Sequence, residues 1–185
     1  LLGAKQSGHM EAVGYDLYCK MLNQAIETLK GNEVNDDFET KVDLVCDAYV
    51  PASYIKNESI KMDVYKRIAG IETLEEYEDM QDELIDRFGD IPNQVENLLQ
   101  IVLLKAAAHK AFVTEISGNK KLIKLTMWNH AKIDSTRIPL LVREYKGRLK
   151  FVPEKLTFEY VPKSNDNSTV IESAKKLVEA LSTLR

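Results

Sequence analysis

The sequence predicts an α+β fold, with a helix-rich first half packed on a small, largely antiparallel sheet and a long helical arm at the N-terminus. Apolar residues recur at steps of three and four through most of the first 111 residues, which is the period of an amphipathic helix. After Gly118 the period changes to two, which is the period of a strand. Runs of helices followed by runs of strands are typical of α+β domains.

The N-terminal arm is predicted over residues 14–30, where apolar side chains share one face and Gly31 follows as a stop. It is preceded by a polar run, QSGH, at residues 6–9, and the chain opens on Leu1 instead of an initiator Met. These features indicate a piece of a longer protein. The chain then divides into three predicted segments, which are the arm with its connecting helix, a polar linker and a domain: residues 1–31, 32–40 and 41–185.

Three further helices are predicted in the first half of that domain. The first covers residues 57–69, with apolar side chains on one face. The second begins after Thr73, which has the pattern of a capping box with Glu76 three residues later, and it ends at Phe88. The third covers residues 93–111 and is apolar almost all round, which is typical of a central, buried helix.

The remaining elements are mostly strands. Alternating apolar and polar residues predict two single strands, and two such runs around Pro153 predict a hairpin. Polar loops separate them from a short helix and from a closing amphipathic helix. In chain order these elements are a strand at 41–46, a strand at 122–127, a helix at 135–145, a hairpin at 149–152 and 156–161, and a helix at 169–184.

The composition is that of an ordinary globular protein of 185 residues with a formal net charge of −4. Cys19 and Cys46 lie far apart without a CxxC pair, so we expect reduced thiols and a cytoplasmic location. No apolar run approaches the roughly 18 residues that span a bilayer, so no membrane partner is expected.

No pattern of an active site or a cofactor site stands out. The sequence has no GxxxxGK[ST] loop, no GxGxxG motif and no nucleophile elbow. The three histidines, His9, His109 and His130, are isolated from one another and lack the spacing of metal ligands. We therefore expect no catalytic residue, no metal ligand and no bound cofactor, and we predict that this chain is not an enzyme.

The predicted helix over residues 73–88 lies in a strongly acidic stretch. Between Glu72 and Asp90 there are nine acidic residues and one basic residue. Four of the carboxylates recur at steps of three and four and are predicted to line one outward face: Glu76, Asp79, Glu83 and Asp86. Five apolar residues are predicted to form the opposite, core-facing stripe: Leu74, Tyr77, Leu84, Ile85 and Phe88.

Two interpretations of the acidic face remain open. The first is a solvated surface that keeps the domain soluble. The second is a docking surface for a basic partner. Like charges at this spacing destabilise a helix by a few tenths of a kcal/mol each, so the sequence tolerates a small repeated cost.

A basic segment follows, with ten Lys or Arg residues and three acidic residues between Lys120 and Lys155. Such a segment can contact phosphates, and Trp128 and Phe151 can stack on bases if they are exposed. Phe151 lies in an alternating strand, which favours a core position. An auxiliary nucleic-acid-binding module is therefore the alternative function.

Several motifs, in order, resemble a known family. The N-terminal run LLGAKQSGH…GYDLYCKML resembles the end of the translocation motif of bacterial transcription-repair coupling factors (Mfd), a motif shared in part with the RecG translocase. Four later motifs resemble landmarks of the C-terminal domain of the same family: DAYVPASYI, YKRIAGI, ELIDRFGDIP and VENLL. The resemblance weakens after about residue 111.

The resemblance implies that the parent protein is an ATP-driven translocase of superfamily 2 that moves on double-stranded DNA. Such a protein removes stalled RNA polymerase and recruits nucleotide-excision repair through UvrA, with ATP and magnesium bound by other domains. The C-terminal domain in this family is non-catalytic. It docks on the UvrB-homology module of the same polypeptide and masks the UvrA-binding surface, which is autoinhibition.

The resemblance also implies roles for individual residues. Gln6 matches the glutamine of the hook loop in the translocation motif. Glu83 and Asp86, in ELIDRFG, match acidic contacts to the UvrB-homology module. Together with Asp79 and Glu76 they make up the predicted interdomain docking face.

Overall fold

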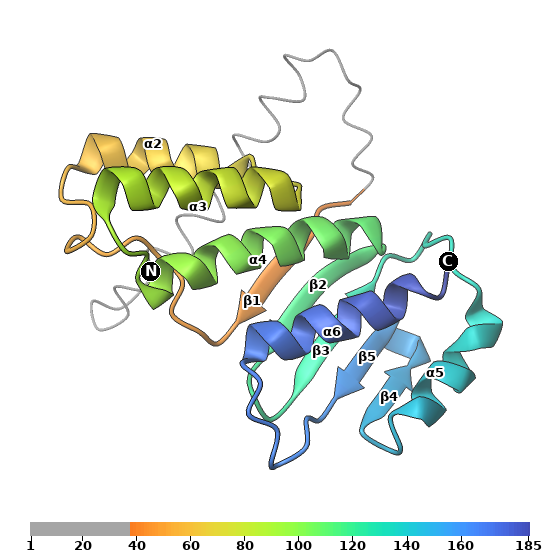
Figure 1. Cartoon of the computed structure of the whole chain (residues 1–185). Coiled ribbons are helices and arrows are strands. Elements are labelled where there is room, and N and C mark those ends of the chain that lie inside the picture. The colour runs from red at the N-terminus through yellow and green to blue at the C-terminus, as the bar shows by residue number, and fades with distance from the viewer. Residues whose placement is uncertain (1–37) are drawn as a thin grey trace. The chain divides into compact units, whose positions relative to one another are not determined.

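The computed structural model describes residues 38–185 (Figure 1). These residues contain five α-helices and a five-stranded sheet, so the predicted α+β class is confirmed. The predicted arm and Gln6 lie outside the described residues. The described chain forms two compact units: Asp47–Leu103 in the first, and Phe38–Cys46 with Leu104–Arg185 in the second.

The first unit is built from helices. α2 (Glu58–Ala69) begins at Asn57, whose side chain accepts a hydrogen bond from the Ile60 N–H. α3 (Leu74–Phe88) begins at Thr73, and α4 (Asn93–Lys110) continues from the first unit into the second. The three predicted helices agree with these bounds to within one residue at each end.

The buried face of α3 differs from the predicted stripe. The structure buries Tyr77, Met80 and Leu84, whereas Leu74 is 62% exposed and Ile85 is 48% exposed. At about 100° per residue, the three buried side chains fall within an arc of roughly 60°, and Leu74 and Ile85 lie to one side of it. The predicted stripe is wrong at these two positions because it counted apolar residues without weighing Met80, which shifts the centre of the face.

The second unit contains the sheet, in the order β1-β2-β3-β5-β4 (Figure 1). β1 pairs with β2 in parallel, and the other three pairings are antiparallel, so the sheet is largely antiparallel, as predicted. The strands are β1 (Lys41–Leu44), β2 (Val113–Gly118), β3 (Ile123–Met127), β4 (Leu149–Val152) and β5 (Thr157–Tyr160).

β2 is absent from the predicted elements. Its pairing with β3 shifts register between Val113 and Glu115, which is the mark of a β-bulge. As a result, the buried residues Val113 and Ile116 are three positions apart instead of two or four. A strand is predicted from strict alternation of apolar and polar residues, and the bulge interrupts this alternation in the sequence of β2.

One face of the sheet forms the core of the second unit. Cross-strand register places Ile116, Leu125 and Phe158 in one row, and all three are fully buried. α6 (Val170–Ser182) crosses the sheet in Figure 1 and contributes seven buried residues. Its start is fixed by a capping box, in which the Thr169 side chain and the Glu172 side chain each bond the other residue's backbone N–H.

Short helical turns complete this unit. The predicted helix over residues 135–145 consists of η2 (Ser135–Arg137) and α5 (Ile138–Glu144). The hairpin between β4 and β5 turns through η3 (Pro153–Lys155). Leu156 then adopts a left-handed backbone with φ of 51°, so β5 starts one residue later than predicted.

Candidate docking surface

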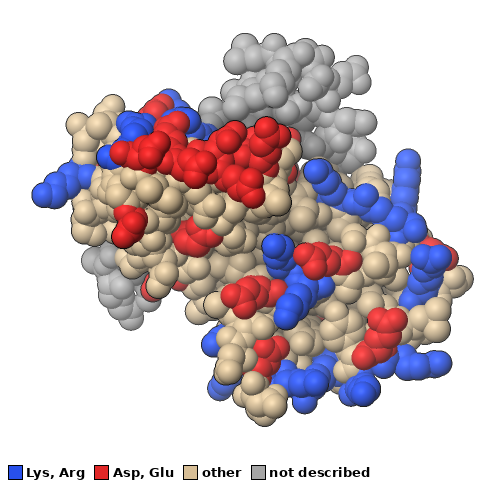
Figure 2. All heavy atoms as spheres, in the orientation of Figure 1, with Lys and Arg blue, Asp and Glu red and all other residues tan. Residues whose placement is uncertain are grey.

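α3 carries seven acidic side chains and one basic side chain. In Figure 2, acidic side chains form a band that follows the position of α3 in Figure 1. The four predicted docking carboxylates fall within an arc of about 80° around the helix. Glu76, Asp79 and Asp86 are exposed, whereas Glu83 is half-buried.

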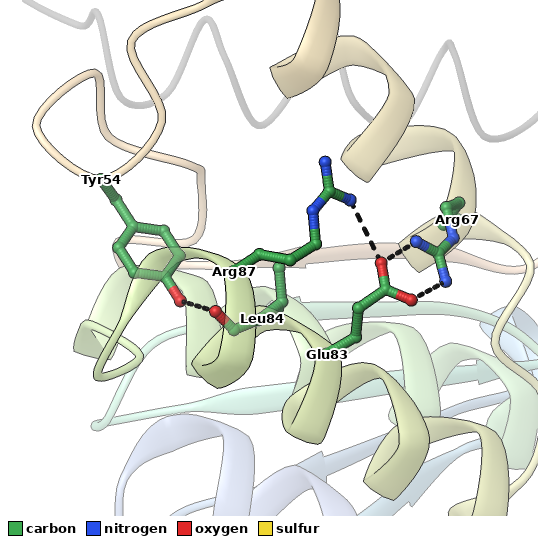
Figure 3. A network of polar contacts seen from close by, with 5 residues as sticks. All are labelled: Tyr54, Arg67, Glu83, Leu84 and Arg87. Atoms are coloured by element: carbon green, nitrogen blue, oxygen red, sulfur yellow. Dashed lines mark hydrogen bonds and ion pairs between the residues drawn. The ribbon is translucent and has the colours of Figure 1, made fainter.

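Glu83 is held by two arginines of the first unit (Figure 3). Arg67 of α2 makes a bidentate pair with it, in which Nη1 donates to Oε2 and Nη2 donates to Oε1, the latter at 2.5 Å. Arg87, one turn further along α3, donates from Nη1 to Oε2 at 3.2 Å. Bidentate arginine–carboxylate pairs fix geometry as well as charge.

This pairing shifts the proton equilibria of both partners. The hydrogen bonds from Arg67 are the main cause that lowers the pKa of Glu83 below its ordinary value, and Arg87 lowers it further. The same contact raises the pKa of Arg67. Glu83 is therefore ionised and already engaged, and its carboxylate orients Arg67 and Arg87 as well as contributing charge.

Glu76 also has a local partner. The Thr73 hydroxyl accepts a hydrogen bond from the Glu76 N–H at 3.2 Å, which caps α3. The Glu76 carboxylate accepts from the Glu72 N–H at 3.2 Å, one residue before the cap. The capping-box pattern thus forms with its second bond displaced by one residue, and Glu76 stabilises the start of the helix.

Asp79 and Asp86 differ from the other two carboxylates. Both are exposed, and neither forms an ion pair with any residue in the described part of the chain. They are seven residues apart, so they share a face and lie about 10 Å apart along the helix axis. These two side chains are the predicted docking residues that remain available to a partner.

A groove runs beside this face, between α2 and α3. Its volume is about 490 Å³. Ile71 and Met80, each 4% exposed, provide its apolar floor. Charged side chains from the two helices form its walls: Lys66 and Arg67 on one side, and Glu76, Asp79 and Glu83 on the other.

Tyr54 fixes the end of α3. Its hydroxyl donates to the Leu84 carbonyl at 3.1 Å and lies 2.9 Å from the Gly89 carbonyl, and its ring packs on Phe88. Burial raises the pKa of Tyr54, and Asp90 raises it further. Sequence reasoning missed Tyr54 and Arg67 as supports of this face, because both act across long sequence separations that leave no local pattern.

The two aromatic residues of the basic segment that were predicted to stack on bases are half-buried and contact other aromatic rings. Trp128 packs almost parallel to Phe38, with centroids 4.9 Å apart, and to Phe112, with centroids 6.2 Å apart. Phe151 packs against the buried Phe158 at 4.7 Å. Both aromatic rings therefore contribute to packing within the second unit.

Two other features bear on chemistry. Among residues 38–185, no group of three or more His, Cys, Asp or Glu side chains has an arrangement that could hold a metal ion. None of the helices in this range has the length and apolar character to cross a membrane.

Comparison with known proteins gives consistent matches. Residues 44–138 match the family described as TRCF domain. The chain is 40% identical over 148 residues to a transcription-repair-coupling factor of Bacillus subtilis. This match covers 78% of this chain and 13% of the relative. The chain is also 43% identical over 129 residues to a transcription-repair-coupling factor of Staphylococcus haemolyticus. That match covers 69% of this chain and 11% of the relative. The chain thus spans a small part of these relatives.

A solved structure shares the fold. The crystal structure of a C-terminal domain of transcription-repair coupling factor superposes with a TM-score of 0.67. The match covers 82% of this chain and 97% of that one, at 24% sequence identity. The likeness supports the α+β architecture described above.

Proposed function

This chain belongs to the TRCF domain family, and on that basis we propose that it is a non-catalytic regulatory domain of a transcription-repair-coupling factor. In this proposal it docks on the UvrB-homology module of its parent protein and masks the UvrA-binding surface. ATP hydrolysis, translocation on double-stranded DNA and contact with RNA polymerase belong to other parts of the parent.

The observation that carries the proposal is the pair of carboxylates at Asp79 and Asp86. They project from one face of α3, about 10 Å apart along the axis, and make no ion pair within the described residues. A basic partner surface is the complement of such a face. The apolar floor of the neighbouring groove, at Ile71 and Met80, offers a place for the aliphatic part of a Lys or Arg side chain.

The four predicted residues are proposed to act in two different ways. Asp79 and Asp86 are proposed to meet the partner directly. Glu83 holds Arg67 and Arg87, and Glu76 caps the helix, so these two are proposed to position the face. Exposed ion pairs contribute about 0–1 kcal/mol each and weaken with salt, which suits a reversible mask.

The test is a binding measurement between this chain and the UvrB-homology module. Asp79→Lys with Asp86→Lys should weaken binding by on the order of tenfold at about 50 mM salt, and by less at about 300 mM. The matched control is Glu154→Lys with Glu179→Lys, which changes the net charge equally on exposed positions of the second unit. It should bind like the unmodified chain.

Two outcomes separate docking from masking. Equal affinities for the α3 variant and its control would rule out docking through this face. In the parent protein, the α3 variant should bind UvrA without prior engagement. Weakened docking with unchanged UvrA binding would refute masking and leave docking in place.

A further inference from the structure

The two compact units carry opposite charge. The range Asp47–Leu103 contains 13 acidic and 5 basic residues, whereas Phe38–Cys46 with Leu104–Arg185 contains 10 acidic and 17 basic residues. Docking through α3 uses the acidic unit and leaves the basic unit without a role. Charge segregated in this way affects the choice of partner and the rate of association.

Three loops of the second unit leave the sheet at the same end. Cross-strand register aligns Gly118, Ile123, Tyr160 and Leu149 in one row. The loops that continue from this row are the β2–β3 turn, the α5–β4 turn and the β5–α6 loop. Segments far apart in the sequence are thereby brought to one edge of the unit.

These loops are rich in cations. We call the cations of the three loops the basic edge: Lys120, Lys121, Lys146, Arg148 and Lys163. The loops contain one acid, Asp166, whose carboxylate accepts a hydrogen bond from the Ser168 N–H at 2.8 Å. In Figure 2, Lys and Arg side chains line the lower margin of this unit, where Figure 1 places the loops.

The cations of the basic edge are exposed or half-exposed. Within the described chain none of the five forms an ion pair, in contrast to Lys124, which lies 3.7 Å from Glu159. Arg148 donates one guanidinium N–H to the Val161 carbonyl at 3.4 Å, and its other donors make no hydrogen bond to a described residue. The edge can therefore accept several anionic groups at once.

Backbone geometry holds the edge in place. Gly118 has φ of 123°, and a Cβ there would lie 2.1 Å from the Leu122 carbonyl oxygen. The Asn119 side chain accepts hydrogen bonds from the Lys121 and Leu122 N–H groups. Gly147 has φ of 85° in the α5–β4 turn. The backbone of these turns is therefore constrained, and it fixes the positions from which the lysine side chains extend.

We propose that the basic edge binds the phosphate backbone of double-stranded DNA. Neutralising phosphates with Lys and Arg is sufficient for sequence-independent binding to a duplex. Binding to single strands relies on aromatic stacking, and Trp128 and Phe151 are half-buried and already packed against Phe38 and Phe158. The four strands that carry these loops, β2, β3, β5 and β4, span roughly 14 Å across the sheet, which is room for several phosphate contacts. This activity does not depend on the docking of α3.

The test uses the 185-residue chain and a fluorescent DNA duplex in an anisotropy titration. The edge variant is Lys120→Gln, Lys146→Gln and Lys163→Gln, one change in each loop. The matched control is Lys110→Gln, Lys132→Gln and Lys155→Gln, three exposed lysines near the opposite end of the sheet. Both variants lose the same charge, so net charge alone cannot separate them.

Five phosphate contacts predict that affinity falls about 500-fold between 50 and 200 mM salt. The edge variant retains two of the cations, which predicts a fall of about 12-fold and a weaker affinity at low salt. The control should keep the steep slope. Equal slopes for the two variants, or no duplex binding by the unmodified chain at low salt, would overturn the proposal. Binding to an acidic polypeptide without binding to the duplex would also overturn it, in favour of a protein partner.

Discussion

At the scale of single residues, Glu83 shows that a carboxylate predicted to meet a partner can have its contacts inside its own unit. Its side chain is 32% exposed and is shared by Arg67 and Arg87. Reversing its charge would break this cluster as well as any contact with a partner. Asp79 and Asp86 are the cleaner positions at which to test docking.

The Glu83 cluster makes stability depend on pH in acid. Because the folded-state pKa of Glu83 is lowered, its contribution is complete above the ordinary Glu pKa of about 4.3 and is lost as the pH falls through the lower, folded value. We expect Glu83→Gln to reduce the free energy of unfolding by about 1 kcal/mol at pH 7. The difference in free energy of unfolding from the unmodified chain should shrink as the pH falls below about 4.3. Urea unfolding at several pH values measures it.

Asp82→Asn is the control for this effect. Asp82 lies in the same helix, is exposed, and forms no ion pair with a described residue. Its replacement should change the free energy of unfolding at pH 7 by less than about 0.5 kcal/mol. A Glu83→Gln deficit that persists unchanged at low pH would show that the carboxylate charge is not its cause.

At the scale of elements, the sequence predicts what local chemistry determines. α2 and α3 follow from Asn57 and Thr73, whose side chains cap the first turn. β2 could not be predicted from the sequence, because its bulge interrupts the alternation of apolar and polar residues. The acidic face of α3 is predictable from its spacing, but the bidentate pair between Arg67 and Glu83 is not. Those residues are 16 positions apart on two helices, and only their packing brings them together.

A polar network joins α3 to the first part of α4. The Tyr77 hydroxyl donates to Glu96, and the Gln81 side chain donates to the Tyr77 hydroxyl at 2.7 Å and to Glu96 at 2.9 Å. Gln100 donates to the same two residues at 3.0 Å. Burial, followed by the hydrogen bond to Glu96, raises the pKa of Tyr77 to about 12.

Tyr77→Phe should lower the free energy of unfolding by about 1–2 kcal/mol at pH 7, because the carboxylate and the two amides lose a buried partner. The raised pKa means that this contribution is complete below about pH 10 and is lost as the pH rises towards 12. The stability gap between Tyr77→Phe and the unmodified chain should therefore narrow in alkali. Urea unfolding at about pH 7, 9 and 11 tests this.

Tyr160→Phe is the matched control. The Tyr160 ring contacts Tyr145, and its hydroxyl makes no hydrogen bond with a residue in the described range. The Tyr160→Phe substitution should change the free energy of unfolding by less than about 0.5 kcal/mol. Equal effects of the two substitutions would argue that the network does not tie α3 to α4.

At the scale of the whole molecule, the net charge of −4 is the sum of one unit with an excess of acidic residues and one unit with an excess of basic residues. The 13 acidic residues of Asp47–Leu103 centre on α3, and the 17 basic residues of the second unit include the basic edge. If the two proposals hold, one chain contacts a basic protein surface and a polyanion through separate groups. Salt weakens both contacts, but each depends on its own set of side chains.

This segregation predicts retention on both kinds of ion exchanger at pH 7 and low salt, because a charged matrix senses a local patch more than the sum of charges. Neutralising Asp79 and Asp86 to Asn should shorten retention on the anion exchanger and leave the cation exchanger unaffected. Neutralising Lys120, Lys146 and Lys163 to Gln should shorten retention on the cation exchanger and leave retention on the anion exchanger unaffected. The salt concentration at elution measures both effects. Since the two variants change the net charge in opposite directions, a molecule with evenly mixed charge would show linked shifts on both matrices, and that result would contradict the existence of two separate surfaces.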